Sequence, residues 1–253
     1  MEVVKDRSVL IAGAADEVCE AIGLRLAGAG AKILIAGDDQ GKTDGIVTRI
    51  KNEIKDSAQY VTGLVADLRT SDGVKKAVET AMDKFGEINI LVNNADDPLN
   101  KAIADMSDDD WNRSIQNNLY PVFFLCREVV PKMAAKKYGR VINIGSMDYL
   151  GWQGKSGYSA AKSALFGFTR SLALETARDR ITVNSVIKGD VTTAGLNEEA
   201  AAKLANSLPV KRMGTPADVS YAVAYFASDT SKYVTGQTLF VCGGRSIHSS
   251  MSI

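Results

Sequence analysis

Residues 9–36 read VLIAGAADEVCEAIGLRLAGAGAKILIA. A continuous apolar run at 9–12 precedes apolar residues that recur at helical spacing between 18 and 29, and a second apolar run follows at 32–36. Helical spacing predicts an amphipathic helix, and short runs rich in Val, Ile and Leu predict strands that are buried on both faces. This stretch therefore predicts a strand, a helix and a second strand in succession.

The same alternation continues along nearly the whole chain. Further strands are expected at residues 60–64, 88–92, 141–144 and 181–186, and a further amphipathic helix at 74–85. Such alternation implies right-handed crossovers, which build a doubly wound parallel α/β sheet of the Rossmann type with ligands beyond the carboxyl ends of its strands. Neither an internal repeat nor a Pro/Gly/Ser-rich linker divides the 253 residues, so residues 1–253 are expected to form a single domain.

Charge and hydropathy restrict the class of partner. Lys+Arg and Asp+Glu are both 30, so no net field attracts nucleic acid or an anionic membrane. The longest apolar runs fall short of the roughly 18 residues that a membrane-spanning helix needs, and residues 1–6 lack the layout of a signal peptide. A cytoplasmic protein without nucleic-acid or membrane partners is expected.

The cysteine and histidine content excludes several kinds of catalytic site. Cys19, Cys126 and Cys242 are odd in number and widely spaced, which predicts buried reduced thiols rather than disulfides or a zinc site. The single histidine, His248, lies in a Ser-rich tail and is expected at the surface. A Ser-His-Asp hydrolase and a multi-histidine metal enzyme are therefore excluded, so any catalysis rests on Tyr, Lys, Ser, Asn or carboxylate groups.

The most specific motif is Ser146, followed twelve residues later by Tyr158 and then by Lys162. Tyr158 and Lys162 are four residues apart and share one face of a predicted helix. An ammonium group beside a phenol favours the phenolate, which makes the tyrosine a usable acid or base. Ser146, at the end of the preceding strand, is placed to hydrogen-bond a substrate oxygen.

Around this motif the chain resembles the short-chain dehydrogenase/reductase family, whose members oxidise alcohols or reduce ketones with a nicotinamide cofactor. The resemblance covers almost the entire chain, and further matches lie at Asp67-Leu68, Asn93-Asn94-Ala95, Trp111 with Asn118, and residues 183–184, 212–219 and 235–237. It implies that the catalytic residues are Ser146, Tyr158, Lys162 and Asn118. In this set, Asn118 belongs to a water-mediated relay behind Lys162. The implied cofactor-binding positions are Gly13, Asp38, Asp67, Asn94, Tyr158 and Lys162.

The interval from Ser146 to the tyrosine is one residue shorter than is common in the family. Either Ser146 shifts, or Gly151 and Gly154 absorb the deletion. Two aromatic residues, Tyr149 and Trp152, lie in this interval. They would form walls of a pocket for a bulky or aromatic substrate, or pack in the core or an interface.

The cofactor-binding turn departs strongly from the family pattern Thr-Gly-x-x-x-Gly-x-Gly. Residues 12–19 read AGAADEVC, so Gly13 is the only glycine that remains. Glu17 and Cys19 replace glycines that let the backbone approach a diphosphate and let the helix pack on the strand. Asp16 and Glu17 also place carboxylates at the helix N-terminus that should hold the diphosphate. Alternatively, the turn moves aside and Glu17 faces solvent.

Further departures fall in the same region. Asp96 replaces a glycine, Lys188 a proline and Cys242 an aspartate of the family pattern. The acid after the second strand, Asp38, comes one residue later than is usual and is followed by Asp39. These two carboxylates either favour NAD over NADP by repelling a 2′-phosphate or belong to a polar loop.

Three functions agree with this pattern. The preferred hypothesis is a subunit with a weak or absent NAD site that assembles, as a dimer or tetramer, with a cofactor-competent relative. This division of roles between two subunits resembles that in paired family members of aromatic hydrocarbon degradation, which oxidise a hydroxyacyl-CoA. Lys188, Lys211 and Arg212 would then meet coenzyme A phosphates or remain solvated. The alternatives are a self-sufficient NAD-dependent alcohol dehydrogenase or ketoreductase and a nucleotide-sensing regulatory protein.

Family oligomers usually pack the helix that carries Tyr158 and the helix before it against equivalent helices.

Overall fold

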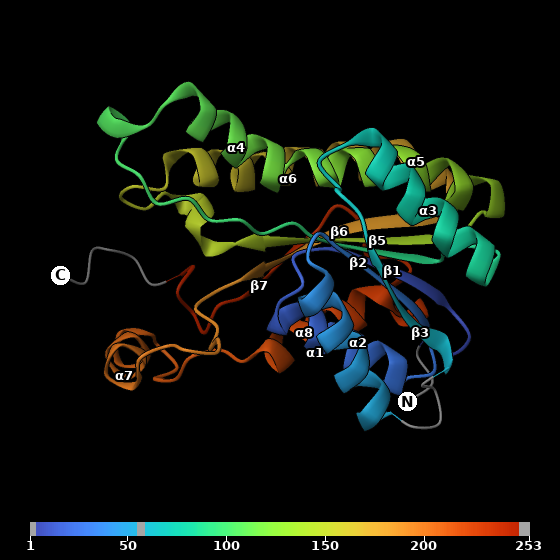
Figure 1. Cartoon of the computed structure of the whole chain (residues 1–253), viewed down its shortest axis with the longest axis horizontal. Helices are drawn as coiled ribbons and strands as arrows, with labels where there is room; N and C mark the ends of the chain where they lie inside the picture. Colours follow the sequence, from blue (N-terminus) through green and yellow to red (C-terminus); the bar gives the residue numbers. More distant parts are fainter. Residues whose placement is uncertain (1–3, 55–58, 248–253) are drawn as a thin grey trace.

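The computed structural model describes residues 4–54 and 59–247, and a single parallel sheet forms its centre (Figure 1). The described strands are β1 (Ser8–Gly13), β2 (Lys32–Gly37), β3 (Val61–Val65), β4 (Ile90–Asn94), β5 (Gly139–Ser146), β6 (Ile181–Lys188) and β7 (Thr238–Val241). They form a seven-stranded sheet in the order β3-β2-β1-β4-β5-β6-β7, with every neighbouring pair parallel. The predicted doubly wound α/β fold is confirmed.

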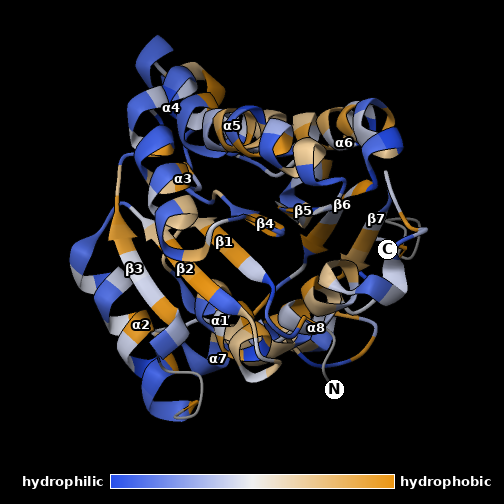
Figure 2. Ribbon diagram, turned by 90° about the vertical axis from the view of Figure 1, so that its right-hand side faces the viewer, coloured by the Kyte–Doolittle hydropathy of each residue, from blue (hydrophilic) through white to orange (hydrophobic). Residues whose placement is uncertain are grey.

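Helices cover both faces of the sheet (Figures 1 and 2). One layer holds α1 (Glu17–Gly28), α2 (Gln40–Glu53) and α8 (Pro216–Ala227), and the other holds α3 (Ser71–Phe85), α4 (Asp108–Asn118), α5 (Tyr120–Lys136) and α6 (Ser156–Thr176). Helix α7 (Glu198–Ser207) stands apart in the connection between β6 and α8. Within residues 4–54 and 59–247, no helix has the length and apolar character that crossing a bilayer requires.

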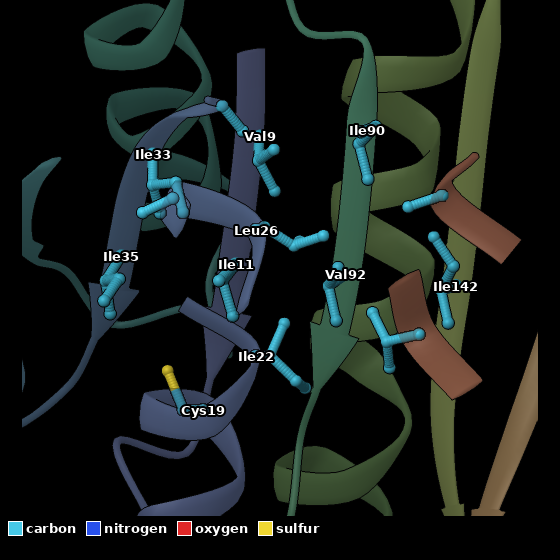
Figure 3. Close-up of a cluster of buried hydrophobic side chains, with 14 of the residues drawn as sticks. Val9, Ile11, Cys19, Ile22, Leu26, Ile33, Ile35, Ile90, Val92 and Ile142 are labelled. Atoms are coloured by element: carbon cyan, nitrogen blue, oxygen red, sulfur yellow. The ribbon is translucent and has the colours of Figure 1, made fainter. Parts of the chain in front are cut away.

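The apolar spacing read from the sequence becomes the core on either side of the sheet. Figure 3 shows Ile22 and Leu26 of α1 among Ile11 of β1 and Val92 of β4, and all four side chains are buried. Burying one such side chain contributes about 1.5–3 kcal/mol of transfer free energy. Strands β1, β2, β4, β5 and β6 have almost continuously buried residues, because helices cover both their faces.

The chain changes direction across the sheet between β1 and β4, and this places a crevice at their carboxyl ends. Here Gly13 lies directly against Asn94, and the Ala14 N–H donates to the Asn94 carbonyl at 2.8 Å. Gly13 has a φ of 129°, and a Cβ there would lie 2.4 Å from the carbonyl carbon and oxygen of Asn94. The remaining glycine of the turn is therefore required by the contact between two chain segments.

Most expected elements are present with small shifts of their ends, but β7 was not predicted. The expected strand at 88–92 begins at Ile90, and the expected helix at 74–85 extends back to Ser71. Strand β7 has only four residues, and its side chains are partly exposed, so its apolar signal is weak. All three cysteines are free and buried, as predicted. His248 lies outside the described residues.

We expect Gly13→Ala to lower the free energy of unfolding by about 1–3 kcal/mol, because its new methyl group would overlap the main chain of Asn94. Gly41→Ala in the first turn of α2 is the matched control, since its nearest atom would be Asp39 Oδ1 at 3.5 Å. Urea denaturation followed by circular dichroism measures both variants. Equal stability of the two variants would contradict this account of Gly13.

Candidate active site

The residues of the predicted catalytic motif meet beyond the carboxyl edge of the sheet. Ser146 ends β5, and Tyr158 and Lys162 lie on the first two turns of α6. All three side chains are buried, since Tyr158, Lys162 and Ser146 are only 2%, 1% and 8% exposed. Gly151 and Gly154, with φ of 97° and 79°, form the turns between Ser146 and α6. These turns carry the chain from β5 to α6, and absorption of the shorter interval by the two glycines stays a prediction.

A carboxylate that sequence reasoning noted only as a departure lies at the centre of this cluster. Asp96 follows β4, and its Oδ1 accepts a hydrogen bond from the Tyr158 hydroxyl at 2.5 Å. Its Oδ2 accepts from Lys188 Nζ at 2.5 Å, and Lys162 Nζ lies 3.5 Å from Oδ1. Asp96 therefore contacts one phenol and two ammonium groups. The expectation that Lys188 is solvated is wrong because it is largely buried and paired with Asp96, while its contact with coenzyme A phosphates stays a prediction.

These contacts set the protonation of Tyr158 in the opposite sense to the expected one. The pKa of Tyr158 lies well above its usual range, mainly because the phenol is buried. The charge of Asp96 and the hydrogen bond to Asp96 raise this pKa further, and Ser146 opposes the rise only in part. The predicted phenolate is therefore wrong for this chain. Lys162 instead donates to the Ala95 carbonyl at 2.5 Å, and burial lowers its pKa despite the nearby Asp96.

The two lysines stabilise the ionised form of Asp96. Burial alone would raise the pKa of Asp96, but the charges of Lys162 and Lys188 hold it well below its usual range. Lys188 loses hydration on burial, yet the charges of Asp96 and Asp16 raise its pKa. These shifts favour an ionised Asp96, a charged Lys188 and a neutral Tyr158, whereas burial opposes the charge of Lys162.

Asn118 holds the loop that carries Asp96. The Asp97 N–H donates to Asn118 Oδ1 at 2.9 Å, and Asn118 Nδ2 donates to the carbonyls of Asp97 and Ser114 at 3.0 and 2.9 Å. Because these bonds occupy both ends of the amide, the contacts of Asn118 are with main chain rather than with Lys162. Its role in a proton relay stays a prediction.

The first turn of α1 carries its own anion, and Asp16 is the one of the two expected carboxylates that caps the helix. Asp16 Oδ1 accepts from the Cys19 N–H at 2.8 Å and from Asn94 Nδ2 at 3.0 Å. Glu17 instead reaches the loop after β6, where its carboxylate accepts from the Ala194 N–H at 2.9 Å. That hydrogen bond is the main reason why the pKa of Glu17 is lowered. Glu17 therefore begins α1, while its carboxylate also contacts the loop after β6.

Cys19 and Asn94 have structural contacts within the fold. The Cys19 side chain is buried in the core beneath α1 (Figure 3), and burial raises the pKa of its thiol. Asn94 Nδ2 donates to the Ala14 carbonyl at 3.0 Å as well as to Asp16. The position where a third glycine was expected is thus filled by a core residue, and Asn94 connects β4 to the turn after β1.

A cavity of about 530 Å³ lies beyond the carboxyl ends of β1 to β4. The acidic and basic side chains that line it are Asp16, Asp38, Asp67, Asp96, Asp97, Lys42, Arg69 and Arg113. Arg69 pairs with Asp67 at 2.7 Å, and Arg113 with Asp97 at 3.0 Å. Asp39 caps α2 by accepting from the Lys42 N–H at 2.8 Å, as expected of a polar loop residue. Among the described residues, no group of three or more His, Cys, Asp or Glu is placed to hold a metal ion.

The aromatic residues of the shortened interval have separate surroundings. The Tyr149 ring packs 4.5 Å from that of Phe166, measured between centroids, which agrees with the packing interpretation. Trp152 is 58% exposed, and the guanidinium of Arg245 lies 5.2 Å from its ring centroid. Trp152 is therefore a surface residue beside Arg245, which agrees with neither buried core packing nor a wall of the described cavity.

The two surface cations that sequence reasoning weighed for coenzyme A have partners in the same chain. Lys211 Nζ donates to the Asn206 carbonyl at 2.8 Å. Arg212 pairs with Asp218 at 2.9 Å. Both side chains remain exposed, so these contacts do not prevent exchange for a ligand phosphate.

A Rossmann-type sheet with a Ser, Tyr and Lys cluster beyond its carboxyl edge defines a class of oxidoreductase fold, and the comparisons agree. A sequence model described as enoyl-(acyl carrier protein) reductase matches residues 13–246. The chain is 42% identical over 244 residues to subunit BbsC of the (2S)-[(R)-hydroxy(phenyl)methyl]succinyl-CoA dehydrogenase of Thauera aromatica, covering 96% of both chains. It is 36% identical to subunit BbsD of the same enzyme, covering 96% of this chain and 98% of BbsD.

Solved structures give the same result. Levodione reductase superposes with a TM-score of 0.91 at 26% identity, covering 97% of this chain and 99% of the reductase. The chain belongs to the short-chain dehydrogenase/reductase family. The suspected similarity to a heteromeric hydroxyacyl-CoA dehydrogenase is confirmed by the two Thauera aromatica subunits.

We expect Cys19→Gly, which restores the glycine of the family turn, to destabilise the protein by about 2 kcal/mol. The variant loses a buried side chain and places a flexible residue in α1. Cys19→Ala is the control that keeps a Cβ and high helix propensity, so its loss should be smaller. Chemical denaturation tests this order, and wild-type stability of Cys19→Gly would show that the thiol is not part of the core.

Proposed function

We propose that this chain is the subunit with a degenerate cofactor site in a two-subunit dehydrogenase that acts on a secondary alcohol, with NAD bound by the partner. The observation that carries the proposal is the Asp96 carboxylate, which accepts a hydrogen bond from Tyr158 and pairs with Lys162 and Lys188. The groups that would serve substrate and cofactor in the family are engaged by a residue of the chain itself.

The residues present do not fit a dinucleotide. A diphosphate bound at the start of α1 would need free N–H groups there, and the Cys19 N–H is already bonded to Asp16. The cavity beside this turn is lined by five Asp residues against three cationic side chains. Because a dinucleotide is itself anionic, this lining opposes its binding.

The relatives support the identity of partner and substrate. BbsC and BbsD are two family members that serve as subunits of one dehydrogenase, and this chain is similar to both. We infer that the partner here is a second short-chain dehydrogenase subunit with an intact glycine turn. The substrate would be a hydroxyacyl-CoA thioester with a secondary alcohol.

The outer faces of α5 and α6 offer a surface for such a partner. Tyr120 and Phe123 of α5 and Leu174 of α6 are 41%, 43% and 83% exposed, and Figure 2 shows hydrophobic residues along both helices. Exposed apolar side chains on neighbouring helices are typical of an interface between subunits. A related subunit with equivalent helices would pack there without a new type of contact.

The competing function is a self-sufficient NAD-dependent dehydrogenase. It is favoured by the assembled cluster of Ser146, Tyr158 and Lys162 and by the cavity beside it. The two functions differ in where NAD binds and in which subunit supplies the catalytic tyrosine, and each difference can be measured.

We expect the isolated chain to bind NADH more weakly than micromolar, because Asp16 and Asp96 occupy positions that the cofactor needs. Calorimetric or fluorescence titration measures the dissociation constant. A partner subunit with an intact glycine turn, titrated under the same conditions, is the positive control. A dissociation constant of about 1 μM or tighter for this chain alone, near −8 kcal/mol, would overturn the proposal.

We also expect turnover of a hydroxyacyl-CoA only when the partner subunit is co-expressed. Tyr158→Phe in this chain should leave the kcat of the assembly nearly unchanged, because the phenol is held by Asp96. The corresponding Tyr→Phe change in the partner should abolish turnover. Turnover by this chain alone that is lost in Tyr158→Phe would establish the self-sufficient dehydrogenase instead.

A further inference from the structure

One phenol and two lysines from two elements converge on one carboxylate. Tyr158 and Lys162 come from α6, and Lys188 ends β6. The side chains of Asp96 and Lys188 are only 14% and 16% exposed, and that of Lys162 is 1% exposed. The 2.5 Å contacts use both oxygens of Asp96, one bonded to the phenol and the other to Lys188. Such a set of donors is what a protein provides for a bound carboxylate.

The charges around this set require an anion at the position of Asp96. Removing it would leave two buried ammonium groups, a state that proteins avoid unless a counter-ion is present. The other acidic groups that face the cluster are committed elsewhere. Asp148 of the segment after β5 pairs with Lys155 at 2.7 Å, and Asp16 caps α1.

We propose that Tyr158, Lys162 and Lys188 form a binding site for a single carboxylate group, which Asp96 occupies as a resident ligand and thereby closes to external ligands. The proposal deepens the function proposed above by naming what closes the site. It is tested without cofactor, substrate or partner, so that either proposal can fail while the other stands.

The sequence carries a matching signal at two distant positions. Asp96 and Lys188 are 92 residues apart, and each departs from the family pattern. Lys188 without Asp96 would add a second buried cation beside Lys162, and Asp96 without Lys188 would leave one carboxylate oxygen without its ammonium partner. The two departures therefore compensate each other, which would not follow from independent loss of an unused cofactor site.

The class of external ligand follows from the size of the group removed. Asp96→Gly deletes a methylene and a carboxylate, so formate or acetate fits the vacated volume, and both carry the charge that the lysines require. Chloride provides charge without the two oxygens that the phenol and Lys188 contact. Formate is therefore the probe, and chloride is its control at equal ionic strength.

The first experiment measures thermal unfolding of Asp96→Gly against formate concentration. We expect a saturable rise in melting temperature with formate that chloride does not reproduce, and no such difference in the wild type. In Asp96→Gly with Lys188→Met, the apparent affinity for formate should fall at least about tenfold, because a charged hydrogen-bond donor is lost. Equal effects of formate and chloride on Asp96→Gly would overturn the proposal.

The second experiment follows ionisation of Tyr158 by ultraviolet absorbance of tyrosinate. Each background is compared with its Tyr158→Phe version, which isolates one phenol among the eight tyrosines. In the wild type, burial and Asp96 hold the proton on Tyr158, so its signal should be absent over the pH range in which exposed tyrosines ionise. In Asp96→Gly, Lys162 and Lys188 face the phenol without the carboxylate, and Asp148 and Asp16 oppose them only from farther away. Burial still raises the pKa of Tyr158, but the midpoint should fall below that of the wild type because the Asp96 charge and hydrogen bond are gone.

Asp96→Asn supplies the same test should the glycine variant not fold. It keeps the size of the side chain and removes its charge, so the Tyr158 midpoint should again fall, although formate should not bind because the volume is filled. A Tyr158 titration in either folded variant that matches the wild type would show that Asp96 does not control the phenol, and the proposal would be wrong.

Discussion

A carboxylate buried at the end of β4 constrains the whole site. An ionised Asp96 is tolerated there only because two ammonium groups and a phenol surround it, and removing one partner of a buried pair typically costs about 3–5 kcal/mol. The identities of Lys162, Lys188 and Tyr158 are therefore linked to one another. The protonation of Tyr158 follows from the same constraint, because its hydroxyl must donate to the carboxylate.

A second carboxylate of the chain accepts main-chain hydrogen bonding at the start of α1. In Rossmann folds the N–H groups of this turn commonly meet a phosphate of the bound dinucleotide. Here the Asp16 carboxylate accepts the Cys19 N–H, and the Asn94 amide supports it from the neighbouring strand. The chain thus provides its own anion at two points of the crevice where a dinucleotide would bring polar or charged groups.

The sequence predicted the architecture well, because long apolar periodicities are local and strong. Strand β7 escaped prediction since it is short and partly exposed. Within the site, the spacing of Tyr158 and Lys162 correctly placed them on one helix face but did not reveal that Ala95 and Asp96 bind them. Such contacts join segments far apart in the chain. Hydrogen bonds between distant segments leave no periodic pattern in the sequence from which they could be predicted.

The departures from the family pattern show the same limit. Asp96 and Lys188 were each recognised as unusual, but a single sequence gives no reason to pair positions 92 residues apart. The contact of Glu17 could not be predicted from the sequence either, because it depends on where the loop around Ala194 folds back. The acidic residues at the helix N-terminus predicted that a carboxylate would lie there. The structure shows that Asp16 is the residue that caps the helix.

Retention of the family motif has a structural explanation in this chain that does not require turnover. Lys162 is fully buried and donates to the carbonyl of Ala95, so it fixes the loop that presents Asp96. Ser146 Oγ accepts from the Asp148 N–H at 3.2 Å and caps the short helix after β5. Replacing either residue would leave buried polar groups without partners, a cost of about 1–3 kcal/mol for each group. The contacts of Lys162 and Ser146 therefore give both residues a role in the fold in addition to any role in a reaction.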